Sequence, residues 1–345
     1  MVTAIDIPSK SSRASAAADR TVALWLLACC AMIFVMVIIG GITRLTESGL
    51  SITEWRPISG VLPPLSAADW QREFALYQHI PEFQQLKPDM TLEEFKGIFW
   101  WEFIHRLWGR LIGVVFAAGF VALLLRRQIR RSLAPHFVAM FVLGGLQGAL
   151  GWFMVQSGLS VRTDVSQYRL AAHFLAALAI YSYMYWIALT LLRPAPAEGT
   201  ARRLRPHLLA IAGALVLTLT FGAFVAGVNG GLVYNSFPLM GGALVPNDAF
   251  QTAWSAFEDP VTAQFIHRWL AMTVVALVLT LWLRRRGLSP AAGRPIGALA
   301  AMALLQAGLG IGTLLLQVPI PLAAAHQAGA VVLWTLTLWS LHATR

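Results

Sequence analysis

The tetrapeptide Phe-Ile-His-Arg occurs at residues 103–106 and again at residues 265–268, each time where a polar loop gives way to a long apolar run. A second histidine follows in each half of the chain, inside an alanine-rich apolar stretch: His173 after His105, and His326 after His267. Neutral imidazole is a favoured ligand of haem iron, and two facing helices can hold a flat macrocycle between them. We therefore interpret the four histidines as two pairs of axial ligands for iron in a porphyrin.

The composition places these histidines in a membrane. Apolar residues make up 57% of the chain and charged residues 12%, whereas soluble domains carry roughly 25% charged residues. Apolar runs of about 20 residues, the length that crosses a bilayer as a helix, recur along the sequence. We predict an all-α integral membrane protein with eight transmembrane helices, near residues 21–43, 99–125, 134–156, 168–192, 206–228, 262–283, 294–316 and 321–342.

The net charge of +10 reflects membrane topology, and we expect no nucleic-acid partner. Arginines cluster after the second, fourth and sixth runs, in loops that contain one acid, Glu198. By the positive-inside rule these loops and both termini are cytoplasmic, and the loops at 44–97 and 229–261 lie outside. The first run is too long for a cleaved signal, and the residues before it are too few for a mitochondrial presequence. We therefore predict a bacterial inner-membrane protein.

Internal repetition predicts the architecture. The segment Gly40–Gly49 matches Gly222–Gly231, and Gln147–Gly151 matches Gln306–Gly310. Each half then holds four spans, an even number, so the halves are predicted to be parallel four-helix bundle repeats related by a pseudo-two-fold axis along the membrane normal. The predicted domains are a cytoplasmic tail at 1–20, a catalytic half at 21–192, a cytoplasmic linker at 193–205 and a cofactor-binding half at 206–345.

The predicted topology also gives the depth of the ligands. Each candidate histidine lies about five to seven residues into a span that enters from outside, which is roughly 7–11 Å below the outer boundary. Two haem sites near the outer, periplasmic face follow, one in each bundle. A single histidine in a span is often a hydrogen-bonded group at a helix contact, but four in register favour ligation.

Glu102 distinguishes the two halves. It lies three residues before His105, on the same helix face, and the equivalent position before His267 is Gln264. An acid beside only one porphyrin site predicts that the first half performs chemistry and that the second holds a resident haem; the alternative is an interfacial acid at a helix start. Arg106 and Arg268 are candidates for binding haem propionates or for anchoring the chain at the interface.

The two cysteines, Cys29 and Cys30, lie together in the first apolar run. Adjacent residues on a helix point about 100° apart, so these thiols are poorly placed to form a disulfide with each other. We interpret them as small apolar side chains of the span. The outer loops contain no cysteine from which a thiol site could be built.

The chain resembles the heme A synthase family. The resemblance rests on residues 40–64 (GGITRLTESGLSITEWRPISGVLPP), 100–110 (WWEFIHRLWGR) and 146–152 (LQGALGW), and on the second-half segments FIHR and AAAHQ. It implies an eight-span enzyme that oxidises the C8 methyl of haem o to the formyl of haem a by successive hydroxylations, with haem b as cofactor. It also implies haem ligation by His105, His173, His267 and His326, with Glu102 as the essential acid. Without loop cysteines, the chain is similar to the branch shared with mitochondrial members.

On this reading His105 and His173 hold the haem o substrate, and His267 and His326 hold haem b. The resemblance makes the haem o synthase (a farnesyltransferase), cytochrome oxidase assembly factors, an electron-transfer protein and a second copy of the chain candidate partners, in addition to the lipid bilayer. The main alternative is a di-haem b-type electron carrier linked to quinol, which usually sets its haems at two depths. A transporter with parallel repeats would need a broken helix or a midplane charge, and neither is evident.

The charge pattern generates a topology prediction. Reporter fusions after residues 130, 200 and 290 should report the cytoplasm, and fusions within 60–90 and 240–255 should report the outside. Paired alkaline phosphatase and fluorescent protein fusions measure this directly. One reversed loop would contradict the placement of all four histidines at a common face.

Overall fold

The computed structural model describes residues 10–192 and 199–345, and the regular secondary structure of this part of the chain is helical apart from one isolated bridge between Met240 and Ala243. Eight of its helices are long and apolar enough to cross a membrane, which confirms the prediction of an all-α protein with eight spans. They are α1 (Lys10–Leu45), α4 (Leu92–Leu125), α5 (Ala134–Gln156), α6 (Gln167–Leu192), α7 (Arg205–Gly227), α9 (Pro260–Leu283), α10 (Pro290–Leu315) and α11 (Ile320–Ala343). The predicted tail at 1–20 and linker at 193–205 lie partly outside the described residues.

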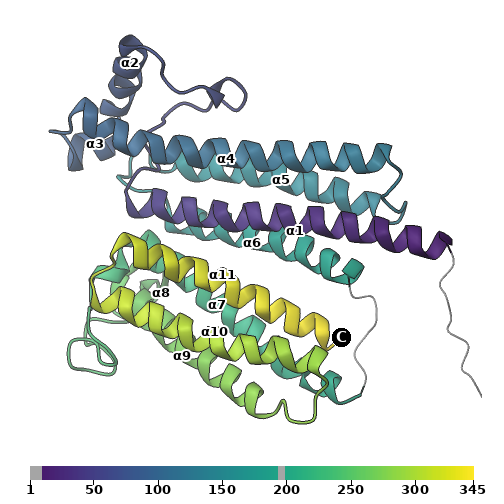
Figure 1. The fold of residues 1–345 in the computed structure, drawn as a ribbon. Coiled ribbons are helices and arrows are strands. Elements are labelled where there is room, and N and C mark those ends of the chain that lie inside the picture. Colours follow the sequence, from purple (N-terminus) through teal and green to yellow (C-terminus); the bar gives the residue numbers. More distant parts are fainter. Residues whose placement is uncertain (1–9, 193–198) are drawn as a thin grey trace, which may run out of the picture.

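The long helices form two groups that lie side by side. Helices α1, α4, α5 and α6 make one group, and α7, α9, α10 and α11 make the other (Figure 1). The short helices α2 (Ala67–Gln78), α3 (Pro81–Leu86) and α8 (Ser255–Glu258) all lie at one end of the molecule, and the C-terminus lies at the other (Figure 1). Three short 3-10 helices complete the described secondary structure, at Ser59–Val61, Gly199–Leu204 and Gly230–Leu232. The pseudo-two-fold axis and the domain boundaries stay predictions.

One hydrophobic core runs through both groups of helices. It includes Leu26 of α1, Tyr181 of α6, Leu215 of α7 and Trp334 of α11. Polar contacts join the groups within this core: the hydroxyls of Tyr181 and Thr335 are 2.7 Å apart, and Trp334 Nε1 donates to Ser182 Oγ at 2.7 Å. Because hydrocarbon offers these polar groups no hydrogen bond, each is paired only when α6 and α11 pack in this one arrangement.

The outward faces of α4 and α5 are apolar and exposed. Val114, Val121 and Leu125 of α4 and Val138 and Val142 of α5 each have more than half of their surface exposed. Soluble monomers rarely expose a continuous apolar surface of this kind, which marks a contact with lipid or protein.

The first predicted outer loop is structured, which the sequence analysis did not predict. Helices α2 and α3 pack on the start of α4 through an aromatic cluster in which Tyr77 and Phe95 are fully buried, with ring centres 5.3 Å apart. A capping box between Thr91 and Glu94 starts α4 at Leu92, several residues before the predicted span. Such reciprocal caps satisfy the free N–H groups of a helix start, so α4 extends beyond its apolar run.

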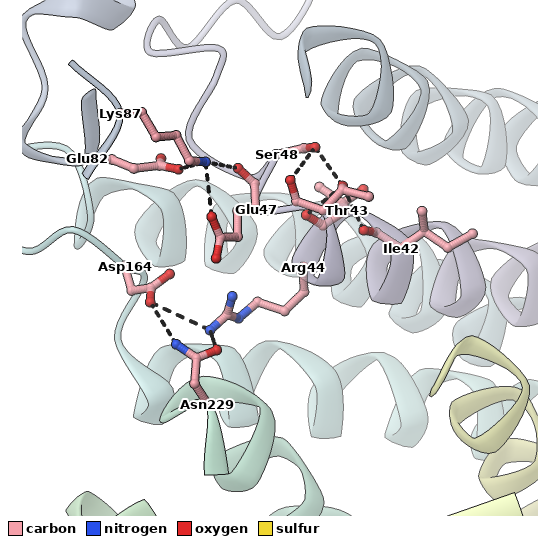
Figure 2. A network of polar contacts seen from close by, with 10 residues as sticks. Ile42, Thr43, Arg44, Glu47, Ser48, Glu82, Lys87, Asp164 and Asn229 are labelled. Carbon is pink, nitrogen blue, oxygen red and sulfur yellow. Dashed lines mark hydrogen bonds and ion pairs between the residues drawn. The ribbon is translucent and has the colours of Figure 1, made fainter. Parts of the chain in front are cut away.

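A polar network at this end ties the outer loop to both groups of helices (Figure 2). Arg44, at the end of α1, donates to Asn229 Oδ1 of the second half at 2.9 Å and lies 3.6 Å from Asp164. Asn229 in turn donates to Asp164 at 3.4 Å. Three residues from three segments therefore form a closed triangle between the halves, which we call the outer clasp.

Beside the clasp, a buried ion pair holds α3. Lys87 Nζ lies 2.6 Å from Glu82 Oε1 and 3.2 Å from Glu47, and it also donates to the Glu47 carbonyl oxygen (Figure 2). Glu82 is only 4% exposed, and burial raises the pKa of its carboxyl above the ordinary value even though Lys87 opposes this shift. Breaking a buried pair leaves an uncompensated charge, so the pair fixes α3 on the end of α1.

Candidate haem-binding sites

The second-half histidines face each other in a geometry that suits a metal between them. His267 of α9 and His326 of α11 have ring centres 6.4 Å apart, with ring planes at 89°. An ion about 2.0–2.1 Å from one nitrogen of each imidazole, with each ring centre about 1 Å further on, separates opposed ring centres by about 6 Å. The separation of the rings therefore suits a bis-imidazole haem iron. Both residues are half-buried.

His267 is also held in the tautomer that a metal ligand needs. Its Nδ1 lies 3.0 Å from the carbonyl oxygen of Thr218 in α7. A carbonyl oxygen can only accept, so Nδ1 carries the proton and donates it. Nε2 is then left with a free lone pair, through which the histidine could bind a metal.

Glycines give the histidine rings room against the neighbouring helices. An added Cβ would lie 3.1 Å from His267 Cε1 at Gly222, 3.0 Å from His173 Cε1 at Gly151, and 2.8 Å from His326 Cε1 at Gly310. At Gly40 it would lie 3.4 Å from His105 Nε2. Each of the four histidines therefore rests on a glycine of an adjacent helix. These glycines belong to the repeated segments found in the sequence. Each repeat therefore supplies a glycine that makes room for an imidazole ring, which we call a glycine seat.

The first-half histidines lie in one group of helices. His105 of α4 and His173 of α6 are both half-buried. Gly40 of α1 and Gly151 of α5 contact their rings, so all four helices of the first group contribute to this site. The structure thus places the predicted ligands as two pairs, one in each group of helices.

Glu102 is fully hydrogen-bonded and buried, with 2% of its surface exposed. Ser51 Oγ and the backbone N–H of Ile52 each donate to Oε2 at 2.7 Å. Arg106 donates twice to Oε1, at 2.6 and 3.0 Å. A carboxylate offers about four acceptor positions, and all are taken. Gln264 makes a different contact in the second half, donating to the Tyr234 carbonyl oxygen at 3.2 Å.

The two predicted propionate ligands bind backbone carbonyls at matching places. Arg106 donates to Ile52 at 2.6 Å and to Glu54 at 3.1 Å. Arg268 donates to Tyr234 at 2.5 Å and to Ser236 at 2.7 Å, so each arginine holds the start of its outer loop. They differ in one respect: Arg268 Nε is buried without a partner in the described part of the chain, whereas Arg106 Nε donates to Glu102.

The family of cytochrome oxidase assembly proteins matches residues 23–338, a region that contains Glu102 and all four histidines. The heme A synthase of Rhodospirillum centenum is 55% identical over 98% of this chain and 92% of its own length. Those of Paramagnetospirillum magneticum, with 50% identity over 94% of both chains, and Nitrosospira multiformis, with 44% over 98% of this chain and 97% of its own, are also similar. The chain belongs to the heme A synthase family. The relatives are bacterial, and with eight apolar helices they support the predicted multi-pass inner-membrane protein.

Sequence reasoning missed some residues that complete the site in this family member. Thr218 provides a backbone carbonyl, which no side-chain pattern reveals. Gln147 and Gln306 were noted only as parts of a repeat, yet each lies against a histidine: Gln147 Nε2 is 3.1 Å from His173 Nδ1, and Gln306 Nε2 is 3.1 Å from His326 Nδ1. The signal was available, because a glutamine repeated four residues before a glycine in both halves marks one helix face.

The glycine seats generate a prediction with a built-in control. Gly310→Ala should displace the His326 ring and weaken haem binding in the second half by about 1–3 kcal/mol, the usual cost of overpacking. Gly308→Ala on the same helix should have no effect, because a Cβ there meets no atom within 4 Å. The absorbance of bound haem per milligram of purified protein measures both. Equal haem content in the two variants would contradict the conclusion that Gly310 makes room for the His326 ring.

Proposed function

We propose that this protein is a heme A synthase that oxidises the C8 methyl of haem o to the formyl of haem a by successive hydroxylations. In this proposal His105 and His173 hold the haem o substrate, and His267 and His326 hold a haem b cofactor. The observation on which the proposal rests is the pair of glycine-seated histidine sites, of which only the first has a buried carboxylate. The names of the relatives support the same conclusion.

The asymmetry supports different roles for the halves. A haem bound by His267 and His326 would supply one-electron transfer. At the position equivalent to Glu102, the second half carries the uncharged Gln264. This suits a resident cofactor that the reaction does not alter. In the first half, Glu102 lies three residues before His105 on α4, so a negative charge stands one turn from the proposed substrate ligand.

We propose that Glu102 acts as a fixed negative charge and not as a base. Loss of two electrons and one proton from the methyl group, with the electrons going to the electron-transfer partner and the proton to solvent, would leave a cationic carbon. A preorganised carboxylate would stabilise that charge without having to reorient. A general base would need a free acceptor position for the proton of a water molecule. The four donors from Ser51, Ile52 and Arg106 occupy these positions, which favours the electrostatic role.

The arginines have unequal roles in the proposal. Arg106 is committed to Glu102 and to the loop carbonyls, so we assign it to holding the outer loop over the first site. Arg268 keeps one buried, unpartnered N–H in the described part of the chain, and a haem propionate is a suitable acceptor for it. Haem o synthase and cytochrome oxidase assembly factors remain proposed partners.

Ligation can be tested separately from chemistry. His267→Ala and His326→Ala should each remove the low-spin haem b spectrum from purified protein, because iron loses an axial ligand. Haem a formation should also fall, since the electron path is lost with the haem. The assay is a reduced-minus-oxidised spectrum, together with chromatography of haems extracted from cells that make haem o. His136→Ala, which changes a histidine outside both pairs, is the control. A normal spectrum in both ligand variants would place the resident haem elsewhere.

The role of Glu102 can be tested with charge and structure separated. Glu102→Gln should lower haem a formation by about 10²-fold while haem b content is retained, leaving haem o or its hydroxylated form in the extract. Ser51→Ala removes one hydrogen bond to the same carboxylate without removing charge, and it should keep most activity. Equal loss in the two variants would show that Glu102 acts by holding the loop. Normal haem a yield in Glu102→Gln would remove it from the mechanism, and a carrier that only transfers electrons would make no haem a at all.

A further inference from the structure

The second histidine of each pair is held by a glutamine from the preceding helix. Gln147 of α5 donates from Nε2 to the carbonyl oxygen of His173 at 2.8 Å and lies 3.1 Å from its Nδ1. Gln306 of α10 repeats both distances at His326, 2.8 and 3.1 Å. The same contact thus occurs twice, in segments far apart in the sequence.

The glutamine and the glycine seat form one motif. Gly151 follows Gln147 by one helical turn, and Gly310 follows Gln306 in the same way, so each glutamine and its glycine share a helix face. The glutamine contacts the ring nitrogen Nδ1, and the glycine contacts ring carbon Cε1. Together they fix the position of the imidazole and its rotation about the last side-chain bond.

The amide oxygens of both glutamines take no part in these contacts. Oε1 of Gln147 and Oε1 of Gln306 are buried without a hydrogen-bond partner among the described residues. A buried acceptor without a donor costs about 1–3 kcal/mol, and this cost occurs at the same place in both halves. Around Gln306 the oxygen is tightly enclosed, since a Cβ on Gly329 would lie 2.2 Å from it. The repetition indicates that the oxygen serves another state of the site.

The position of the proton on the imidazole ring indicates which state this is. With the amide nitrogen donating to Nδ1, the single proton of the neutral ring lies on Nε2. A histidine that binds iron through Nε2 carries its proton on Nδ1, which then becomes a donor and needs an acceptor. The amide oxygen of the same glutamine is that acceptor once the amide has turned about its last bond. The turn gives up the hydrogen bond from the glutamine Nε2 to the histidine carbonyl oxygen, a cost that the bond between Nε2 of the histidine and iron must offset.

We propose that Gln147 and Gln306 are positioning residues that accept the Nδ1 proton of His173 and His326 when these histidines bind haem iron. The acceptor fixes the tautomer and increases electron donation from the imidazole to the iron. For Gln306 this inference rests on the proposed function, in which His326 binds haem b. Its consequence is a lower reduction potential for that haem, since a more basic ligand stabilises the oxidised iron.

The test compares two substitutions of Gln306 in the full-length, haem-loaded protein. Gln306→Met keeps the length of the side chain but removes the acceptor, so the midpoint potential of haem b should rise and haem retention should weaken by about 10- to 100-fold. Gln306→Glu offers a stronger acceptor, so the potential should fall. Thr313→Val, on the same helix, removes a hydroxyl that donates to the Leu309 carbonyl oxygen, and it should leave the potential unchanged. Spectroelectrochemical titration of the purified protein measures all three.

The midpoint potentials of the two Gln306 variants and the haem b content of the wild type decide whether Gln306 has this role. Opposite shifts in Gln306→Met and Gln306→Glu support the inference, and the Glu variant alone decides if the Met variant does not accumulate. Unchanged potentials, or shifts in one direction, overturn it. A wild-type protein without haem b would overturn the proposed function and this inference with it, whereas a haem-bearing wild type with unmoved variants overturns only the role of Gln306.

Discussion

Hydrocarbon cannot hydrogen-bond to an imidazole, so a histidine in a membrane span needs a partner supplied by the protein. The Thr218 carbonyl oxygen serves His267, while Gln147 and Gln306 serve His173 and His326. Each partner contacts Nδ1. The carbonyl oxygen leaves Nε2 of His267 free for a metal, and the proposed turn of the glutamine amides would do the same for His173 and His326. The arrangement of helices follows from this need, because partner and ring come from different helices that must approach closely, and glycines permit that approach.

The two candidate sites differ at the residue three positions before the first histidine of each pair. Glu102 and Gln264 occupy equivalent places before the first histidine of each pair, and both are buried. Glu102 accepts hydrogen bonds from Ser51 and Ile52 in the loop before α2. Gln264 instead donates a hydrogen bond to the Tyr234 carbonyl oxygen in the loop before α8. In each case the following arginine, Arg106 or Arg268, binds loop carbonyls. One exchange of acid for amide therefore changes the charge of the site while leaving the loop attachment in place, so chemistry and resident-cofactor binding can share one architecture.

The spans and the histidine pairs could be predicted from the sequence, because both depend on local signals. Apolar run length predicts a membrane helix, and the repeated Phe-Ile-His-Arg segment marks the first candidate ligand of each half. The folded loop before α4 could not be predicted in the same way: α2 and α3 depend on the packing of Tyr77 against Phe95, a tertiary contact between residues outside the predicted spans. The outer clasp was equally hidden, since Arg44, Asp164 and Asn229 meet only through the tertiary fold.

Two haem sites in separate groups of helices can exchange electrons at a defined rate only if the groups keep a fixed separation. The continuous core through α1, α6, α7 and α11 resists sliding of one group against the other, because close-packed interiors do not deform freely. The hydroxyl contact between Tyr181 and Thr335 fixes α6 against α11 within the bilayer region, and the outer clasp fixes the halves beside the loops. These restraints act at two levels along the helices, so they oppose tilting as well as separation. The interface between the halves is therefore as much a part of the proposed redox function as the histidines themselves.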